Sequence, residues 1–429
     1  MLKNKLLNKL KSKQFKNFII YGLGQAVNLI GPLLVLPYIV HVCGEEGLGK
    51  AGVGFSFALI AIVLVDYGSY INGTKFIAIN NTNRDVLEEK FTTIYLTKLL
   101  LLLVVLIFCT LLIFTIPFFK KDASQIVLSL SIVVGQFINP TWFFQGLQNF
   151  KWISLINILS KVIYVGCVLL FIQKPQDYIY INAFLGIGSI VASSIGFLKL
   201  YYQYSFSFKS TSISKAIQLI KEEFSLTISQ LFFSFYQYAP IMLVSYVGGD
   251  FMAGQYRIID QVIMIFRTYF QMFFNFIYAE VCLKIYQNIR IGINNWKITN
   301  GYNYLLVLVL LLLFFFNTQI ILTFFKVNEQ DVFKLAPLFK TGLLIPVFMG
   351  ISFALKQLIF AFDKNKIYIK ITLFSTVLSL GLMYLFLKNI GLLGAFLSTI
   401  IIEGFIIIMY LIILKQYLFK TKECNERVN

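Results

Sequence analysis

Long apolar stretches recur along the whole chain and are separated by short polar segments. A helix needs about 20 predominantly apolar residues to cross a bilayer, and twelve stretches approach or exceed that length. These stretches cover residues 17–42, 51–71, 95–117, 123–145, 152–173, 178–200, 217–247, 251–285, 302–325, 335–361, 367–387 and 391–414. The pattern predicts an all-α integral membrane protein with about 12 transmembrane helices.

Composition supports this prediction, because 58% of the residues are hydrophobic, whereas soluble proteins are usually about 45–50% apolar. Lysine and arginine outnumber aspartate and glutamate by 37 to 19. With a cytoplasmic N-terminus, 24 basic residues fall in inner segments and seven in outer ones. The positive-inside rule therefore predicts that both termini are cytoplasmic. Topology and attraction to membrane lipids explain the basic excess, so we expect no nucleic-acid partner.

A short motif occurs twice, at the end of the first and of the seventh apolar stretch. The copies are VCGEEGLG from residue 42 and VGGDFMAG from residue 247, in which Gly44 and Glu45 match Gly249 and Asp250. Both halves enter from the inside, which predicts two six-helix lobes related by a pseudo-two-fold axis along the membrane normal. The expected parts are a basic amphipathic cytoplasmic leader (1–16), an N-terminal lobe (17–200), a cytoplasmic linker (201–216), a C-terminal lobe (217–415) and a cytoplasmic tail (416–429).

The eighth stretch carries charges at bilayer depth. Arg257, Asp260, Met264 and Arg267 are three or four residues apart, so they fall on one face of a helix. A charge at this depth costs at least about 2.5 kcal/mol on insertion scales and normally faces a cavity or a partner. The stripe therefore indicates a wet, net-cationic interior. A local Arg257–Asp260 ion pair that only fixes helix packing is the alternative interpretation.

Among the charged residues of the apolar stretches, six basic and four acidic ones are assigned to the interior of the spans. They are Lys98, Lys161, Arg257, Arg267, Lys340, Lys356, Asp66, Asp260, Glu280 and Glu403. Lys98, Lys340 and Glu280 lie close to predicted span ends, where long side chains reach back to the interface. In a cavity, the basic residues suit an anionic substrate and the acidic residues suit a proton or Na⁺. Packing remains the alternative role for each of them.

Motifs for metal binding or group-transfer chemistry are missing from the sequence. The five cysteines are scattered without a CxxC pair, and the single histidine, His41, ends an apolar stretch before a glycine-rich turn. We expect neither a disulfide framework nor a metal site. A membrane glycosyltransferase or polymerase generally needs a sizeable extramembrane loop, and the predicted outer loops are short. We therefore expect that the protein is not an enzyme and holds no resident cofactor.

Three segments carry a family resemblance. They are the first stretch with its turn (17–49), the exit of the second stretch (65–83), and residues 139–165, which contain a Trp-Phe-x-Gln-Gly motif and Lys161. These segments resemble the Wzx-type flippases of O-antigen or capsule repeat units, in the multidrug/oligosaccharidyl-lipid/polysaccharide exporter superfamily. The C-terminal half is similar to the same family through VGGDFMAGQYRI and FAFDKNK.

The resemblance implies a function for the chain and roles for its buried charges. The implied activity is transport of an undecaprenyl-diphosphate-linked oligosaccharide from the cytoplasmic to the periplasmic leaflet of a bacterial cytoplasmic (inner) membrane by alternating access. Coupling to a H⁺ or Na⁺ gradient is implied, as are membrane lipids, a polysaccharide polymerase and a chain-length regulator as partners. The implied substrate-binding cations are Arg257, Lys161, Arg267, Lys356 and Lys98, and the implied ion-coupling acids are Asp66, Asp260 and Glu403.

Other functions stay open at this point. A multidrug or lipid II exporter of the same superfamily is the main alternative, and a membrane glycosyltransferase or polymerase is a weaker one. The interior of a drug–cation antiporter should be dominated by acidic residues, whereas this chain has more basic ones in its spans. That balance favours the flippase.

Overall fold

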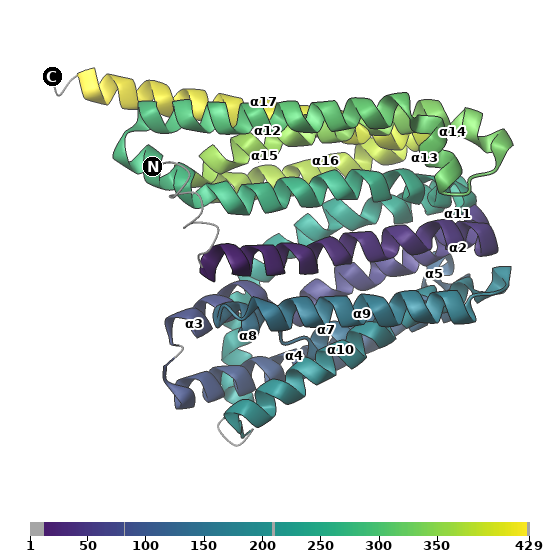
Figure 1. Cartoon of the computed structure of the whole chain (residues 1–429), viewed down its shortest axis with the longest axis horizontal. Coiled ribbons are helices and arrows are strands. Elements are labelled where there is room, and N and C mark those ends of the chain that lie inside the picture. The colour runs from purple at the N-terminus through teal and green to yellow at the C-terminus, as the bar shows by residue number, and fades with distance from the viewer. Residues whose placement is uncertain (1–12, 81, 208–210, 427–429) are drawn as a thin grey trace. The chain divides into compact units, whose positions relative to one another are not determined.

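Helices make up all the regular structure of the part of the chain described here. The computed structural model describes residues 13–80, 82–207 and 211–426, and it contains α-helices, one π-helical turn and one 3₁₀ turn in these ranges (Figure 1). Ten helices in the described ranges are long and apolar enough to cross a membrane. The predicted fold class, an all-α membrane protein, is thereby confirmed.

The chain divides into two compact units, Met1–Ser234 and Phe235–Asn429. The division falls inside the long helix α11 (Ile213–Gln287). Most of the predicted leader lies outside the described residues, as do positions 208–210 of the predicted linker and 427–429 of the predicted tail. The predicted limits of lobes, linker and tail stay predictions.

The first unit is built around α2 (Lys13–Asp66), which packs on α9 (Phe150–Phe171), while α10 (Ile181–Tyr204) packs on α7 (Ser131–Ile138) and α9. α11 contributes its first part to this unit. The other elements are the π-helical turn η1 (Ser69–Gly73), α3 (Thr74–Ile79), α4 (Arg84–Thr115), α5 (Pro117–Lys120), α6 (Ala123–Ser129), α8 (Thr141–Gly146) and the 3₁₀ turn η2 (Pro175–Tyr180).

An aromatic core fixes α4 against α8 and α10 in the first unit. The ring centroid of Phe91, on α4, lies 6.2 Å from that of Trp142 and 5.4 Å from that of Phe143, both on α8. One turn further along α4, the ring of Tyr95 meets the edge of Phe197 on α10 at 4.9 Å. Aromatic pairs in such geometries add to the free energy of apolar burial. This packing holds the next turn of α4, which carries a buried lysine, in a defined place.

The second unit contains the rest of α11 and six further helices. They are α12 (Ile289–Phe316), α13 (Thr318–Phe324), α14 (Glu329–Gly342), α15 (Leu344–Ala361), α16 (Asn365–Ile390) and α17 (Leu392–Glu426). The last helix packs along α16 and α15 and also contacts α14. Buried residues of α11, α15, α16 and α17 form a common apolar core. These four helices also carry the polar site of this unit.

The repeated sequence motif has the same backbone geometry in both units. Gly44 interrupts α2 with φ 71° and ψ 174°, and Gly249 interrupts α11 with φ 83° and ψ 170°. Only glycine adopts this region readily. Each break separates two of the predicted spans, so two of the ten candidate membrane-crossing segments hold two apolar stretches each. The sequence predicted a glycine-containing turn between two helices at both places, and the structure has a break between two helices at each of them.

We expect Gly44→Ala and Gly249→Ala each to lower the stability of the protein. No heavy atom lies within 4 Å of a Cβ added at either position, so the cost is conformational and amounts to about 1–3 kcal/mol. Gly166→Ala and Gly381→Ala are matched controls, because these helical glycines also have open space around them but no positive φ. Alanine there is expected to be neutral or stabilising. Thermal unfolding of the purified variants in detergent measures the difference, and equal midpoints for all four would contradict it.

Candidate functional site

A polar pocket in the second unit gathers side chains from four helices. It lies among α11, α15, α16 and α17, and most of its polar atoms come from α11 and α17. The pocket is lined by Tyr236, Gln237, Pro240, Tyr256, Arg267, Ile345, Met349, Ser379, Thr399 and Glu403. Two of the predicted site residues, Arg267 and Glu403, are therefore brought together here. In a membrane, polar groups of this kind normally face a cavity or each other.

Glu403 is the acidic group of this pocket and is 5% exposed. Its two carboxylate oxygens accept hydrogen bonds from different helices: the Tyr236 hydroxyl donates at 2.9 Å and the Ser352 hydroxyl at 2.8 Å. Hydroxyl donors partly compensate the loss of water around a buried carboxylate. Tyr236 and Ser352 were not predicted as site residues, because their link to Glu403 spans 167 and 51 residues of sequence. These two hydroxyls fix the orientation of the carboxylate in the pocket.

Arg267 is the cationic group of the same pocket. Its Nη1 atom is buried and makes no hydrogen bond to any described residue, and no described carboxylate forms an ion pair with it. A buried donor left unsatisfied costs about 1–3 kcal/mol. The guanidinium has five donors in a planar fork that matches carboxylate and phosphate oxygens. The pocket thus presents an available donor that suits an anionic group, next to a carboxylate and hydroxyls that suit polar ligands.

The predicted charged stripe of α11 is present. Arg257 Nη1 lies 3.4 Å from Asp260 Oδ2 and 3.9 Å from Met264 Sδ. Asp260 is 7% exposed, so the ion pair of the alternative interpretation is formed in the structure. Arg257 and Asp260 do not line the pocket that contains Arg267. Their roles in substrate binding and ion coupling stay predictions.

Lys356, on α15, lies among aromatic rings instead of lining that pocket. Its ammonium is 5.1 Å from the centroid of Tyr368, 5.3 Å from that of Phe353, 5.5 Å from that of Phe274 and 5.6 Å from that of Phe360. Cation–π contacts are worth roughly 0.5–2 kcal/mol each, depending on exposure. The four rings come from α11, α15 and α16. Lys356 therefore ties these helices together, and its predicted substrate contact stays a prediction.

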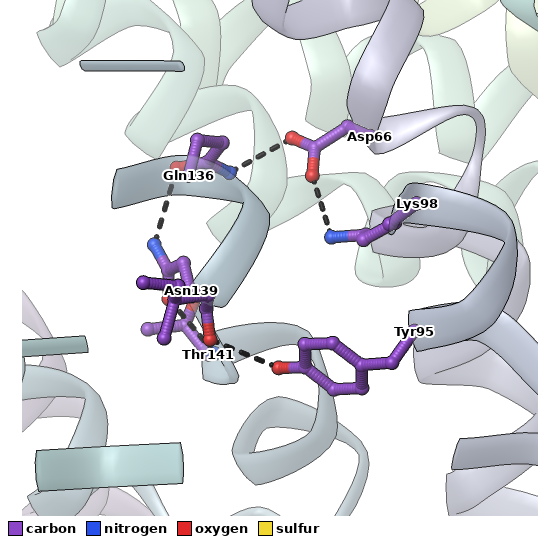
Figure 2. Close-up of polar contacts among 7 residues, drawn as sticks. Asp66, Tyr95, Lys98, Gln136, Asn139 and Thr141 are labelled. Carbon is purple, nitrogen blue, oxygen red and sulfur yellow. Dashed lines mark hydrogen bonds and ion pairs between the residues drawn. The ribbon is translucent and has the colours of Figure 1, made fainter. Parts of the chain in front are cut away.

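A second polar cluster, in the first unit, surrounds the end of α2 (Figure 2). Asp66 Oδ1 accepts a hydrogen bond from Lys98 Nζ at 2.8 Å, and Asp66 Oδ2 accepts one from Gln136 Nε2 at 2.8 Å. Figure 2 shows the Gln136 side chain continuing the chain of contacts to Asn139, whose amide donates to it at 3.2 Å. The backbone N–H of Thr141, at the start of α8, donates to the side-chain oxygen Oδ1 of Asn139 at 3.0 Å. One aspartate thus connects α2, α4, α7 and α8.

The predicted interfacial position of Lys98 is wrong. Its side chain is 1% exposed and ion-paired with Asp66, whose side chain is 18% exposed. The apolar stretch begins at residue 95, but α4 already begins at Arg84, so Lys98 lies well inside the helix. A buried lysine at this depth needs a counter-charge, and Asp66 supplies it. Glu280, predicted to reach the interface, is exposed and lies 2.5 Å from Lys284.

Lys161 lies on α9, in the first unit, and packs its aliphatic stem on α2. A Cβ built on Gly31 would lie 3.2 Å from Lys161 Cβ, so glycine at this position permits the close approach. No described residue forms an ion pair or hydrogen bond with the Lys161 ammonium. Lys161 is thus a membrane-depth cation whose predicted contact with an anionic substrate stays a prediction.

Most of the chain has the fold of solved multidrug resistance transporters. It matches an inward-facing multidrug resistance MATE family transporter of the MOP superfamily with a TM-score of 0.73 and 14% identity, covering 94% of this chain and 99% of that one. An outward-facing MATE family transporter of the MOP superfamily matches with a TM-score of 0.64 and 14% identity, covering 94% of each chain. At this identity the likeness shows the fold alone, which is the two-lobe helical fold of MATE transporters.

Sequence comparison defines the family more closely. The model of the polysaccharide biosynthesis protein family matches residues 15–282, which is more than half of the chain, and the chain belongs to this family. A protein of Escherichia coli (strain K12) named as an O-antigen transporter is 25% identical over 242 residues, which are 56% of this chain and 58% of that protein. A Shigella dysenteriae protein of the same name is 24% identical over 255 residues, 58% of this chain and 62% of its own length. The chain thus spans about three fifths of these relatives.

Proposed function

We propose that the protein is a flippase that moves an undecaprenyl-diphosphate-linked oligosaccharide from the cytoplasmic to the periplasmic leaflet of a bacterial inner membrane. The observation that carries this proposal is the buried Nη1 atom of Arg267, which is an available donor in a polar pocket of the second unit. A diphosphate or an acidic sugar is an anionic ligand that a planar guanidinium binds through paired hydrogen bonds. The family and the names of the two relatives support a polysaccharide-type substrate.

The pocket has room for about one water molecule in this structure, so the helices around it would have to separate before a substrate enters, and its remaining lining would then offer polar partners to a sugar. Sugar hydroxyls both donate and accept hydrogen bonds, and the pocket offers the Glu403 carboxylate together with Ser379 and Thr399. Tyr236 and Tyr256 add aromatic faces with polar ends, which suit ligands that are apolar on one face and polar at the edge. No bond of the substrate needs to break for transport, so the protein acts as a transporter and not as an enzyme.

Alternating access with ion coupling completes the proposed cycle. Asp66, Asp260 and Glu403 are the carboxyl groups proposed to take up H⁺ or Na⁺, and no other cofactor is proposed. Both termini are proposed to be cytoplasmic, and a polysaccharide polymerase and a chain-length regulator are the proposed protein partners. A lipid II exporter would share the diphosphate and differ in its sugars, whereas a drug–cation exporter would gain nothing from Arg267.

Flipping by the purified protein in liposomes tests the proposal. A fluorescent undecaprenyl-diphosphate oligosaccharide is placed in both leaflets, and a membrane-impermeant quencher reports the fraction that moves to the outer leaflet over time. We expect movement faster than in protein-free liposomes, with a further increase under a pH or Na⁺ gradient. Lipid II and a fluorescent drug cation are run in parallel. Movement of the drug cation without movement of any lipid-diphosphate oligosaccharide would contradict the proposal and favour the multidrug exporter.

A further inference from the structure

A small pocket at the end of α2 contains a buried carboxylate that the Asp66–Lys98 pair does not explain. It is lined by Asp66, Tyr67, Ser69 and Gly73 near the end of α2, by Lys90, Ile94, Thr97 and Lys98 of α4, and by Leu219 and Glu223 of α11. All of these residues belong to the first unit. The space is large enough for about one water molecule or an ion of similar size.

Glu223 is 8% exposed, and its side chain has one described partner. Asn72 Nδ2 donates to Glu223 Oε2 at 2.6 Å, and no described lysine or arginine nitrogen lies within 4.0 Å of the carboxylate. A neutral amide does not balance the charge of a carboxylate removed from water. A bound cation or a proton would supply the positive charge that no ion pair among the described residues gives to Glu223.

The backbone beneath Glu223 is shaped to receive it. Tyr67 and Gly68 have left-handed φ values of 42° and 74°, and the π-helical turn η1 follows directly. A Cβ on Gly68 would lie 2.7 Å from Glu223 Oε2, so only glycine leaves room for the carboxylate. The turn also places Ser69 in the pocket wall. Ser69 is 6% exposed, and its hydroxyl makes no hydrogen bond to any described residue.

None of the other charged or titratable groups described around the pocket forms an ion pair with Glu223. Lys98 is ion-paired with Asp66 at 2.8 Å. The ammonium of Lys90 lies 5.1 Å from the ring centroid of Phe76. Tyr67, from the end of α2, is neutral in its ordinary state. The pocket therefore combines a carboxylate that has no close counter-ion with a hydroxyl that has no described partner.

We propose that this pocket binds a small monovalent cation, either Na⁺ or a proton, which neutralises Glu223. Hard cations prefer oxygen ligands, and the pocket offers oxygens of Glu223, Ser69 and Asp66. Glu223 lies on the first part of α11, whose later part belongs to the second unit. Cation binding therefore regulates how firmly the start of α11 docks on the end of α2. The inference that this docking affects transport rests on the proposed flippase function. The binding of the cation to the pocket does not depend on that function.

Binding is tested on the full-length protein in detergent without any lipid substrate. The midpoint of thermal unfolding is measured in NaCl against choline chloride at constant ionic strength, and then across a pH series in choline chloride. Binding of radioactive Na⁺ is measured directly on the same preparations. We expect either a saturable stabilisation by Na⁺ or, for a proton, a pH-dependent midpoint with no Na⁺ response. Because no flipping is measured, failure of this test and failure of the proposed function are separate results.

Variants assign the response to the pocket. Glu223→Gln is expected to abolish the Na⁺ or pH response, and Ser69→Ala to weaken Na⁺ binding about tenfold, which corresponds to about 1.4 kcal/mol. Glu222→Gln is the matched control, because Glu222 is the neighbouring carboxylate and is exposed, and it should keep the wild-type response. If Glu223→Gln does not fold, Ser69→Ala decides. A wild-type protein that responds to neither cation, or a response that persists in the folded variants, overturns the proposal.

Discussion

Replacing Arg267 with glutamine is expected to slow the flipping of a lipid-diphosphate oligosaccharide by roughly 10- to 150-fold. A hydrogen bond to a charged group contributes about 1.5–3 kcal/mol, and 1.4 kcal/mol corresponds to a factor of ten. Arg267 Nη1 is buried without a described hydrogen-bond partner, so the substitution removes a donor that no protein contact uses. Arg267→Lys should fall between the wild type and the glutamine variant, because lysine keeps the charge but loses the planar fork.

The control for this prediction is another arginine of the same unit. Arg290 is exposed, so Arg290→Gln removes the same charge without touching the pocket and should flip at the wild-type rate. Initial rates are measured in liposomes with equal amounts of folded protein, as judged by size-exclusion chromatography. A well-folded Arg267→Gln variant with the wild-type rate would show that Arg267 does not contact the substrate.

Substitutions of Arg257 would test contact with the substrate less clearly than substitutions of Arg267, although both residues lie on the same stripe of α11. Removing Arg257 leaves Asp260, which is 7% exposed, without its ion-pair partner at 3.4 Å. Breaking a buried pair destabilises a protein through the charge that remains. Lost transport in an Arg257 variant would therefore mix a folding defect with a substrate effect. For this reason the pocket of Arg267 and Glu403 is the better place to test substrate recognition.

Hydrophobic length and the placement of glycine were sufficient to predict the fold class. The apolar stretches mark every helix long enough to cross a membrane in the described chain, because crossing length is a property of a single segment. The repeated motif marks Gly44 and Gly249, where the structure has matching backbone breaks. That a single glycine makes each break could not be predicted, since it depends on the packing of both flanking helices.

The partners of the buried charges could be predicted only within one helix. Arg257 and Asp260 are three residues apart on α11, and helical spacing brings them together. Asp66 and Lys98 lie on different helices, and Tyr236 reaches Glu403 across 167 residues. Helical periodicity gives the face on which a side chain lies but not the helix that covers this face. Contacts of this kind therefore had to come from the structure.

The burial of Glu223 also could not be predicted from the sequence. Glu222 and Glu223 are adjacent, identical in chemistry and located in the polar start of an apolar stretch. Glu222 is exposed, whereas Glu223 is buried, with 8% of its surface exposed. Glu223 is buried because it lies on the side of α11 that packs on Gly68. The left-handed φ of Gly68 creates the room for its carboxylate. No sequence pattern distinguishes the two glutamates.

Breaking the Asp66–Lys98 pair from either side is expected to destabilise the protein by about 3–5 kcal/mol, the usual cost of leaving one buried charge without its partner. Asp66→Asn leaves the ammonium of Lys98, whose side chain is 1% exposed, without a counter-charge. Lys98→Met leaves the carboxylate of Asp66 with Gln136 as its remaining partner in this cluster. The yield of folded protein and the midpoint of thermal unfolding in detergent measure the loss. Lys215 and Glu89 are the control, because they form an exposed pair at 2.6 Å in the same unit, and exposed pairs contribute only about 0–1 kcal/mol.

The double variant Asp66→Asn/Lys98→Met distinguishes a structural pair from a coupling group. Neutral replacements of both partners remove the uncompensated charge, so stability should recover toward the wild type and give a coupling energy well above that of the Lys215–Glu89 cycle. If Asp66 also carries H⁺ or Na⁺ during transport, the recovered double variant should flip at a rate that no longer responds to the gradient. A recovered variant that keeps the full gradient response would restrict the pair to holding α2, α4 and α7 together, and ion coupling would then depend on other carboxylates. Single variants as stable as those of the exposed control pair would instead show that the Asp66–Lys98 contact contributes little to the fold.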